Sequence, residues 1–442
     1  MLKGEEELIE FLSRTEVSFD GLNFSMLSQI FLFERGLGRL KINSILSCIK
    51  IFSLESYVKS LFALTYRIKE VNEDVIFVNE INNNSMIDNI RAVEKRYKHN
   101  FKELITDKRL KNRNSIFLWS FFRFRSYFAN FFSFCALLFK ERKKIKTISS
   151  RFNVSYILLI FNFFDSYFVV NCLQGLLKKA RYLDVLVLNT DVHKISRALV
   201  FLTSKKAITS YVLQHGSTVL PYGYLPVSAD KIFTWGELSN KWFIERGTPN
   251  NKLLTAGTPK MDNILNYLKE TKRKKGKNIL VIVNPIGINQ VIKYLTILYN
   301  SNIHINYSVT IKLHPSSEDN RSEVIRVFGK TSVTIRKNVD IHQLISESNF
   351  VITTTSTVAN EAIALRVPLI QIVLDDSSPK LEYDSFGCSM NIRDSNELVK
   401  SLTNNSLHKS KLRTYEKYIE EYFYKLDGLS TERIIKEISK HK

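Results

Sequence analysis

Hydroxyl residues gather where an apolar run of the chain ends, in the segment 349–362 (NFVITTTSTVANEA). The run predicts a buried strand followed by a helix, so Thr355, Ser356 or Thr357 is expected to cap that helix. The free N–H groups and the positive dipole end of such a helix attract phosphate. Glu361, in the first helical turn, can accept a hydrogen bond from a ribose or sugar hydroxyl. An ordinary helix cap beside an exposed glutamate accounts for the pattern equally well.

A histidine ends another candidate strand, in KLHPSS (residues 312–317). Pro315 restricts the backbone to a turn after His314, and Lys312 lies two residues earlier on the same face of the strand. An imidazole at this place can donate a hydrogen bond to a phosphate oxygen, more strongly when it is protonated. A histidine bonded to the backbone of a tight loop is the alternative interpretation.

A second histidine follows an earlier candidate strand, in LQHGS (residues 213–217). Gly216 allows close approach of the backbone or a positive φ. An imidazole with a pKa near neutrality suits a general base that deprotonates an attacking hydroxyl, so His215 is the candidate base. Asp191 and Glu237, at neighbouring strand ends, are rival candidates for the same role.

The segments around these residues predict an α/β fold with two parallel sheets. Short β-branched runs alternate with helical patterns, and ligands bind beyond the carboxyl ends of strands in open parallel sheets. The expected strands of the first sheet lie in residues 74–80, 101–106, 183–191, 207–216, 229–237 and 252–262. Those of the second lie in residues 278–285, 308–315, 332–337, 349–356 and 367–374.

The length of 442 residues and a charged run between Lys269 and Lys277 indicate more than one domain. We expect a helical accessory segment over 1–72, with one stripe beginning at Leu8, Phe11 and Leu12 and another at Ile45, Leu46 and Ile49. A Rossmann-like acceptor domain is expected over 73–268, and a Rossmann-like donor domain with closing helices over 278–442.

The formal net charge of +21 indicates an anionic partner, and no nucleic-acid-binding motif accompanies it. Four scattered cysteines, none in a CxxC arrangement, suggest neither a zinc site nor a disulfide framework and fit a reducing compartment. The acidic start MLKGEEELIEF lacks the basic region of a secretion signal. We therefore expect a cytoplasmic protein that does not bind nucleic acid.

An aromatic run over 116–139, inserted with its flanks (110–150) in the first domain, interrupts the α/β pattern. Arg123 and Arg125 argue against a membrane-spanning helix. Basic residues follow the run at Lys140, Arg142, Lys143, Lys144 and Lys146. Two interpretations stay open: shallow insertion into the anionic inner face of the cytoplasmic membrane through residues 116–146, or a buried helix packed on the accessory segment.

Five motifs, in this order, resemble one known family. They are QHGS (214–217), ADKIFTWGE (229–237), AGTPKMD (256–262), KLHP (312–315) and the segment 340–372 (DIHQLISESNFVITTTSTVANEAIALRVPLIQI). The pattern resembles bacterial surface-polysaccharide glycosyltransferases of the GT-B fold, which make capsule and lipopolysaccharide, and is related to that of polysialyltransferases and CDP-glycerol glycerophosphotransferases. The resemblance covers roughly residues 183–375.

The resemblance implies two Rossmann-like domains with a nucleotide-linked donor in the cleft between them. It implies that His314 and Pro315 contact the nucleotide phosphate and that Ser356 and Thr357 hold the donor. The acidic base motif of polysialyltransferases is absent, and Gln214, His215 and Gly216 take its place. Gly257, Thr258, Pro259 and Asp262 match the GTP..D turn of the glycerophosphotransferases, at the hinge side of the cleft.

The expected function is transfer of a sugar or sugar acid from a CMP-, CDP- or UDP-linked donor to a glycan or lipid-linked acceptor of a bacterial surface polysaccharide. The family implies that no metal or other cofactor is needed, and the sequence has no DxD motif. The alternatives are transfer of a polyol phosphate, as from CDP-glycerol, a non-hydrolysing nucleotide-sugar 2-epimerase, and a binding or scaffold protein with an inactive cleft.

Overall fold

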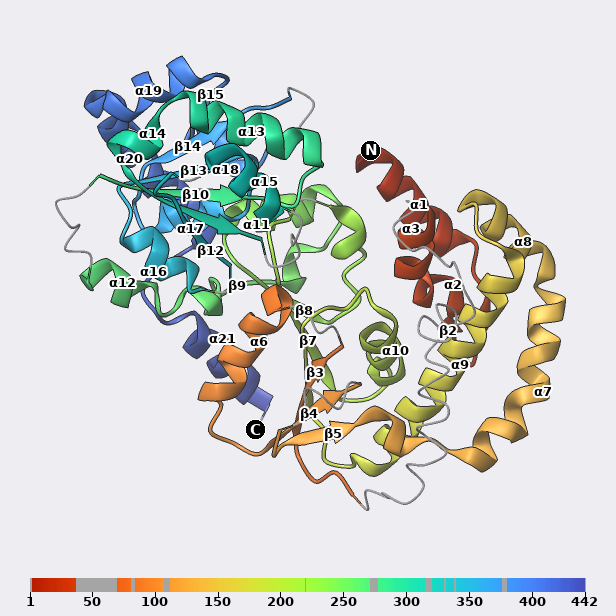
Figure 1. The fold of residues 1–442 in the computed structure, drawn as a ribbon. Helices are drawn as coiled ribbons and strands as arrows, with labels where there is room; N and C mark the ends of the chain where they lie inside the picture. Colours follow the sequence, from red (N-terminus) through yellow and green to blue (C-terminus); the bar gives the residue numbers. More distant parts are fainter. Residues whose placement is uncertain are drawn as a thin grey trace. The chain divides into compact units, whose positions relative to one another are not determined.

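The computed structural model shown in Figure 1 has two compact units, each built on one parallel sheet. Unit 1 comprises Met1–Thr234, Ser239–Pro259 and Thr431–Lys442, and unit 2 comprises Trp235–Leu238 and Lys260–Ser430. The structure describes residues 2–36, 70–80, 84–106, 112–218, 220–270, 277–314, 320–329, 331–337, 339–375 and 380–441. The two units are described separately.

The sheet of unit 1 has seven strands in the order β5-β4-β3-β6-β7-β8-β9, and every neighbouring pair is parallel. The first strand in sequence, β3, lies beside β6, so the strand order reverses between these two. The chain connections therefore cover opposite faces on the two sides of this switch point. The strands are β3 (Val75–Asn79), β4 (Phe101–Ile105), β5 (Ser115–Phe117), β6 (Val185–Leu188), β7 (Thr209–Leu213), β8 (Lys231–Thr234) and β9 (Leu253–Thr255).

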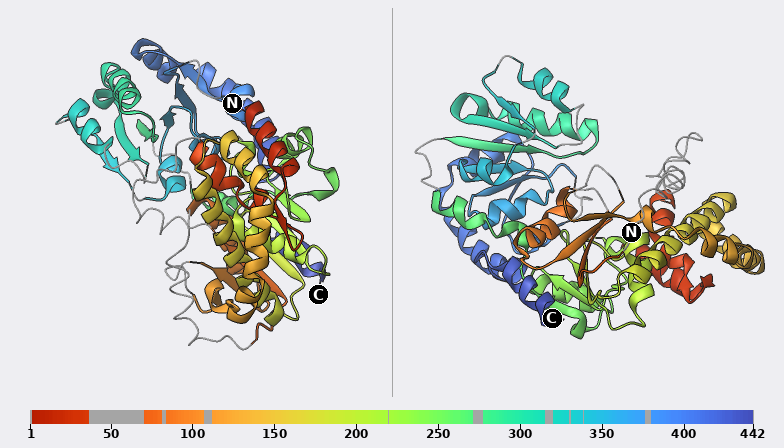
Figure 2. Two further views of the ribbon diagram at one scale, coloured as in Figure 1. Left: turned by 90° about the vertical axis from the view of Figure 1, so that its right-hand side faces the viewer. Right: turned by 90° about the horizontal axis from the view of Figure 1, so that it is seen from below.

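Alternate residues of each strand enter two separate hydrophobic cores, as the two-residue period of a strand requires. Val75 and Phe77 face α6 (Asn84–Arg96) and α21 (Ser430–Ile438), and Arg96 of α6 pairs with Glu432 of α21 at 2.9 Å. Ile76 and Val78 enter the other core. Figure 2 shows α21 in dark blue near the C-terminus.

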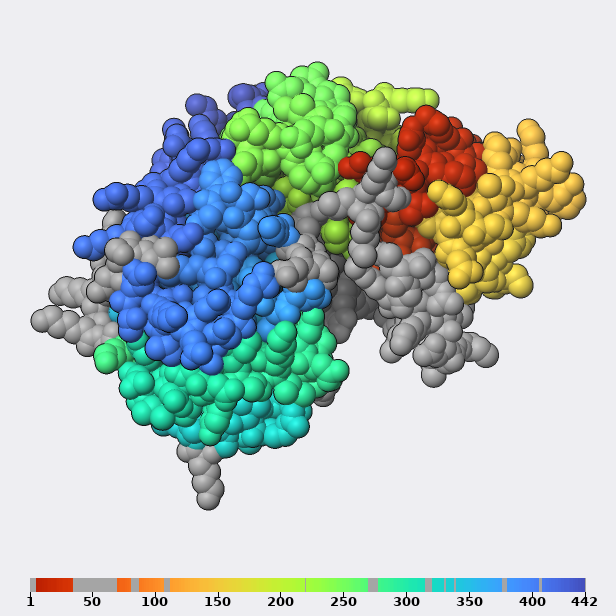
Figure 3. All heavy atoms as spheres, turned by 90° about the horizontal axis from the view of Figure 1, so that it is seen from above, coloured from red at the N-terminus to blue at the C-terminus, as the bar shows by residue number. Residues whose placement is uncertain are grey.

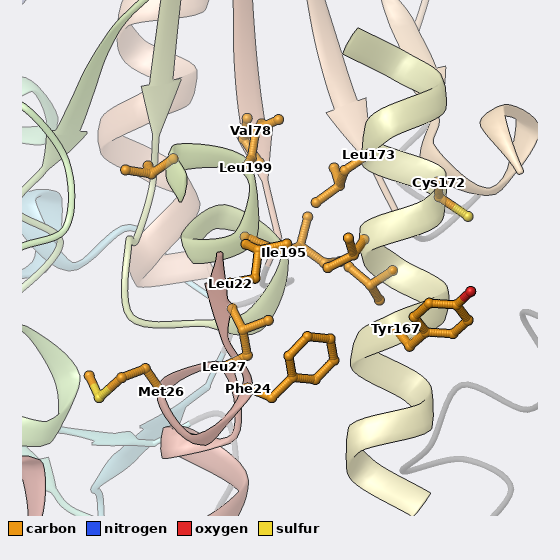
Figure 4. Close-up of a cluster of buried hydrophobic side chains, with 14 of the residues drawn as sticks. Leu22, Phe24, Met26, Leu27, Val78, Tyr167, Cys172, Leu173, Ile195 and Leu199 are labelled. Atoms are coloured by element: carbon orange, nitrogen blue, oxygen red, sulfur yellow. The ribbon is translucent and has the colours of Figure 1, made fainter. Parts of the chain in front are cut away.

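The opposite core of unit 1 contains two helices and the N-terminal segment. The helices are α9 (Tyr156–Lys179) and α10 (Lys194–Thr203). The N-terminal segment consists of α1 (Leu2–Arg14), a hairpin of β1 (Ser18–Phe19) and β2 (Leu22–Asn23), α2 (Phe24–Leu27) and α3 (Gln29–Gly36). Figure 4 shows Leu22, Phe24 and Leu27 of this segment beside Ile195 and Leu199 of α10 and Tyr167 of α9. The expected stripe at Ile45, Leu46 and Ile49 lies outside the described residues.

One buried arginine links the N-terminal segment to the sheet. Arg197, on α10, is 0% exposed and donates to the Met26 carbonyl, to Gln29 Oε1 at 2.5 Å, and to the carbonyls of Asp191 and Pro226. Burial lowers the pKa of this guanidinium to about 10. Because this value is still well above 7, Arg197 is charged at neutral pH. Its five N–H donors suit a site where several loop carbonyls converge.

The aromatic run begins as an edge strand and becomes a helix only at Phe124. The strand β5 and a 3₁₀ turn (Leu118–Phe121) precede α7 (Phe124–Lys140), and α8 (Arg142–Arg151) connects α7 to α9. The α7 residue Phe134 packs on Phe24 of the N-terminal segment with ring centroids 5.1 Å apart. Figure 3 shows the N-terminal segment in red next to these helices in gold.

The sheet of unit 2 has six parallel strands in the order β12-β11-β10-β13-β14-β15. The order reverses between β10 and β13, which is the second switch point. The strands are β10 (Asn278–Val283), β11 (Ser308–Leu313), β12 (Thr334–Arg336), β13 (Phe350–Thr353), β14 (Leu369–Ile372) and β15 (Met390–Ile392).

Helices cover the sheet of unit 2. One hydrophobic core of this unit contains side chains of β10, β11, β13 and β14. The helices are α12 (Ile264–Glu270), α13 (Ile288–Asn300), α14 (Ile303–Asn306), α15 (Asn320–Phe328), α16 (Ile341–Ser346), α17 (Val358–Ala364), α18 (Glu382–Ser385), α19 (Ser395–Thr403) and α20 (Asn405–Phe423). Buried hydroxyls position α17 on α20, because Tyr418 donates to Asn360 Oδ1 at 2.8 Å.

The α/β fold with two parallel sheets is confirmed, and each predicted strand contains an observed one. The strands β5 and β15 and the β1–β2 hairpin were not predicted, because two or three residues give too short an alternation to recognise. The helix α9 was also not predicted as a separate element.

We expect Arg197→Met to destabilise unit 1, because the Gln29 and Met26 oxygens would stay buried without their donor. The loss should be about 3–5 kcal/mol, which lowers the melting temperature by about 10 °C. Differential scanning calorimetry measures it, with the exposed Arg181→Ala as control. Equal melting temperatures for the two variants would show that Arg197 does not hold the N-terminal segment.

Candidate active site

The switch point of unit 2 is marked by an asparagine that directly follows β10. Asn284 Nδ2 donates to Thr354 Oγ1 at 2.8 Å and to the Thr355 carbonyl at 2.9 Å, which joins the carboxyl ends of β10 and β13. Asn284 is 9% exposed. The buried amide joins the ends of two neighbouring strands and so orders the loops at the switch point. Ligands bind at this place in sheets with this strand order.

The hydroxyl run after β13 leads into α17, as the sequence indicated. Ser356 is buried, its Oγ accepts from the Val358 N–H at 3.3 Å, and its own N–H donates to the Tyr383 hydroxyl at 3.3 Å. Thr357 occupies the N-cap position, is exposed, and makes no side-chain cap bond. Its hydroxyl is therefore available to a ligand, while that of Ser356 orders the turn.

Glu361 lies on α17 with one carboxylate oxygen paired and the other not. Oε1 accepts from Lys260 Nζ at 3.2 Å, and Oε2 is buried without a hydrogen-bond partner. The ring of His342 is near enough for Glu361 and Lys260 to influence its pKa, which burial lowers. A buried unpaired carboxylate oxygen is costly, and a ligand hydroxyl would satisfy it.

A polar cavity of about 290 Å³ opens beyond the carboxyl ends of β13, β14 and β15. Thr354, Thr355 and Gln371 line it together with the charged side chains of Lys380 and Arg393. Gln371 is 5% exposed, and its Oε1 is buried without a hydrogen-bond partner. Asp384 and Glu397 line it as well, so the cavity has donors, acceptors and both signs of charge, which suits a polar ligand.

Lys312 and His314 lie at the end of β11. Lys312 is partly buried, and burial lowers its pKa. His314 is exposed, and partial desolvation together with the charge of Lys312 lowers the pKa of its imidazole. A phosphate would favour the charged form of both side chains. Pro315 lies outside the described residues.

In unit 1 the loop after β7 contains Gln214, His215 and Gly216, and Asn89 of α6 connects it to a second loop. Asn89 donates to the Gln214 carbonyl at 3.1 Å and accepts from the Thr258 hydroxyl at 3.2 Å. Gly257, beside Thr258, has a φ of 86°, which favours glycine. The structure therefore joins the loop of residues 214–216 to the turn of residues 257–259, where Pro259 is buried.

The His215 imidazole stacks on the Tyr224 ring, with centroids 4.5 Å apart and planes 8° from parallel. A Cβ on Gly216 would lie 3.3 Å from the Tyr224 hydroxyl, so glycine keeps this contact unstrained. Desolvation and the neighbouring His193 lower the pKa of His215 to about 3. Burial lowers the pKa of His193 to about 4. Both rings are therefore uncharged at pH 7. The sequence suggested instead that the pKa of His215 would be close to 7.

Asp191, a rival candidate base, and Asp262, of the turn predicted at the hinge side, both have hydrogen-bond partners within the fold. Asp191 is 3% exposed and its Oδ2 accepts from the N–H groups of Ser228 and Ala229 at 2.6 and 3.0 Å. Burial raises the pKa of Asp191. Asp262 Oδ1 accepts from the Ser430 N–H at 2.9 Å within unit 2. These bonds order loops of the protein.

Glu237 is exposed in the first turn of α11 (Glu237–Glu245). Glu237 belongs to unit 2, as part of the short stretch Trp235–Leu238. His215 belongs to unit 1.

Several polar residues at the switch points were not predicted. Glu80, after β3, accepts from the N–H groups of Ile195 and Ser196 at 2.8 Å each, and both amide atoms of Asn189, after β6, are buried without partners. Asn284 and Lys260 belong to this group in unit 2. The only sequence signal was a polar residue directly after an apolar run. Among the described residues, no group of three or more His, Cys, Asp or Glu side chains could hold a metal ion.

We expect unit 1 to lose stability as the pH falls from about 6.5 towards 4. The imidazoles of His193 and His215 take up protons near pH 6.5 when unfolded but only at about 4 and about 3 when folded, so acid favours the unfolded state. His193→Gln should flatten this part of the profile of melting temperature against pH. His99→Gln, at an exposed position before β4, is the matched control. An unchanged slope in His193→Gln would contradict this assignment.

The chain is similar to two groups of solved structures. The UDP-GlcNAc 2-epimerase from Neisseria meningitidis bound to UDP-GlcNAc is 15% identical, with a TM-score of 0.54 over 83% of this chain and 99% of that one. A putative UDP-N-acetylglucosamine 2-epimerase from Listeria monocytogenes is 14% identical, with a TM-score of 0.53 over 84% and 97%. The wall teichoic acid polymerase TagF, in a complex soaked with CDPG, is 13% identical, with a TM-score of 0.50 over 96% and 98%.

No protein-family model and no curated protein matches the chain. At these identities the similarity shows the fold alone. Two parallel sheets, each with a reversal of strand order beside its first strand, and the likeness to these enzymes show that the protein has a GT-B-like fold of two Rossmann-like domains.

Proposed function

We propose that the protein transfers a group from a nucleotide-activated donor to an acceptor of a bacterial surface polymer, and that unit 2 binds the donor. The observation that carries the proposal is the carboxyl edge of the unit 2 sheet, where Glu361 Oε2 on α17 and Gln371 Oε1 on β14 are buried without partners. Enzymes of similar fold were solved with UDP-GlcNAc or after a CDPG soak, which supports a nucleotide-linked substrate.

In this proposal the nucleotide lies across the carboxyl ends of β10, β11 and β13. Glu361 accepts a hydrogen bond from a ribose hydroxyl, and Thr355 and Thr357 donate to phosphate oxygens. His314 and Lys312 stabilise the negative charge that develops on the departing phosphate, the electrostatic contribution that is usually largest in such reactions. Lys260 neutralises Glu361 and holds its carboxylate in place.

Unit 1 is proposed to carry the acceptor chemistry, with His215 receiving the proton of the attacking hydroxyl. A pKa of about 3 makes the unliganded imidazole a weak base. An anionic group of the acceptor bound beside the ring would raise that pKa, because a nearby negative charge favours the protonated form. His215 would then be activated only when the anionic substrate is present.

The transferred group is proposed to be a sugar or sugar acid for capsule or lipopolysaccharide. Transfer of a polyol phosphate is the second candidate, favoured by the likeness to TagF, which spans 96% of this chain. The nucleotide product separates the two. A sugar leaves a nucleoside diphosphate when its donor is UDP- or CDP-linked, whereas transfer of glycerol phosphate from CDP-glycerol leaves CMP. We propose that the reaction takes place in the cytoplasm.

Nucleotide binding tests the donor site. We expect one of CMP, CDP, UDP or GDP to raise the melting temperature, because a ligand of the folded state stabilises it by mass action. Glu361→Gln should bind that nucleotide about tenfold or more weakly, because a hydrogen bond to a charged acceptor is replaced by one to a neutral amide. Isothermal titration calorimetry measures the affinity, with the exposed Glu420→Gln as control.

Two results would contradict the proposal. If no nucleotide shifts the melting temperature, the donor site does not exist and a scaffold role is favoured. If Glu361→Gln binds as tightly as the wild type, the nucleotide lies elsewhere.

The released nucleotide tests the reaction class once the donor base is known. With an acceptor present and a UDP- or CDP-linked sugar as donor, we expect a nucleoside diphosphate, measured by ion-exchange chromatography. Release of CMP from CDP-glycerol would favour the second candidate. Conversion of the donor sugar without acceptor and without nucleotide release would indicate an epimerase.

A further inference from the structure

Four phenylalanines of α7 form an exposed stripe that the fold does not use. Phe124 is 50%, Phe128 51%, Phe132 81% and Phe139 70% exposed. At 100° per residue these four side chains lie within an arc of about 80° on the helix. Ile157 and Phe161 of the adjacent helix α9 are also exposed.

The remaining face of α7 already holds the helix in place. Tyr127, Phe134 and Leu138 are buried, and Phe134 stacks on Tyr167 of α9 with ring centroids 4.5 Å apart. The Tyr167 hydroxyl donates to the Tyr127 carbonyl at 2.7 Å. Because α7 packs through these residues, the exposed stripe is free for a contact outside this chain.

Basic side chains border the stripe. The segment 124–151 contains seven Lys or Arg residues and a single acidic residue, Glu141. The guanidinium of Arg142 lies 4.6 Å from the centroid of the Phe139 ring. Lys143 and Lys146 are exposed and have no carboxylate partner among the described residues. An apolar stripe with a cationic border is the arrangement of helices that lie in a membrane interface.

We propose that the α7 stripe and the basic residues of α8 form a docking surface for an anionic lipid bilayer, which α7 enters lying flat. A second copy of the chain would bring two strongly cationic surfaces together, whereas an anionic bilayer complements the charge. Each basic residue near such a surface strengthens binding about fivefold. The proposal does not depend on the function of the nucleotide site.

The structure favours shallow docking over spanning. Among the described helices α9 alone is long and apolar enough to cross a membrane, but 67% of its most apolar window is buried inside the protein. It also contains the buried polar residues Asn162, Asp165 and Asn171. The exposed apolar residues of α9, Ile157 and Phe161, lie near its start, next to α8.

Vesicle co-sedimentation tests the proposal on the full chain. Wild-type protein should bind vesicles of phosphatidylcholine with about 30% phosphatidylglycerol and not vesicles of phosphatidylcholine alone. The double variant F132S/F139S should bind about tenfold or more weakly. The control Ile305→Ser, which removes an exposed isoleucine of unit 2, should bind as the wild type does.

Two double variants of equal net charge distinguish the effect of the basic residues of α8 from the effect of the protein's net charge. Lys143→Glu with Lys146→Glu should weaken binding more than Lys205→Glu with Lys206→Glu, which changes the net charge equally at exposed positions outside α8. Phe132→Trp gives a second readout if the serine variants misfold, since brominated lipid should quench its fluorescence beyond that of the wild type.

Three results with lipid vesicles would overturn the proposal. They are no binding of the wild type to the anionic vesicles, undiminished binding of F132S/F139S, and absence of extra quenching in Phe132→Trp. A dimer in light scattering that F132S/F139S dissociates would assign the stripe to a second copy and overturn it as well.

Discussion

The carboxyl edge of a parallel sheet is the constraint on which both units depend. Every strand ends on that edge, and at the β3–β6 and β10–β13 switch points the following loops turn towards opposite faces of the sheet. Backbone groups there lose their strand partners, so side chains must replace them. Glu80 in unit 1 accepts from two backbone N–H groups in the first turn of α10, and Asn284 in unit 2 donates to the Thr355 carbonyl and to the Thr354 hydroxyl. Thr354 and Thr355, which line the cavity of unit 2, bond directly to Asn284.

Both edges keep buried polar atoms without partners, at Asn189 after β6 in unit 1 and at Glu361 and Gln371 in unit 2. In unit 1 the buried charge of Arg197 is matched by carbonyls and by Gln29, and Asp191 is matched by two backbone N–H groups. These bonds order the loops of unit 1 and the N-terminal segment. In unit 2 Glu361 and Gln371 each keep a buried oxygen without a partner. The energetic cost of these oxygens would be recovered by a ligand with hydroxyl or amide donors, which a nucleotide offers.

The sequence predicted the strands and the order of the motifs, because β-branched runs and the polar residues that end them are local signals. His215 and Ser356 lie after β7 and β13, as expected. The pKa of His215 could not be predicted, since it depends on burial and on His193, which follows a different strand, β6. The role of Asn284 was also hidden, because a single polar residue after a strand has no distinctive spacing. The exposed stripe of α7 needed the structure to show which of its aromatic residues are buried.

The most direct measurement is a crystal structure of the protein with the nucleotide that stabilises it. The account predicts density for the ribose against Glu361 and for the phosphates beside Thr355, Thr357 and His314, at the carboxyl ends of β10, β11 and β13. In the same structure the ligand or ordered water should donate hydrogen bonds to the buried oxygens of Glu361 and Gln371. Density for the nucleotide at the β3–β6 edge of unit 1, with the unit 2 edge unchanged, would contradict the assignment of the donor site.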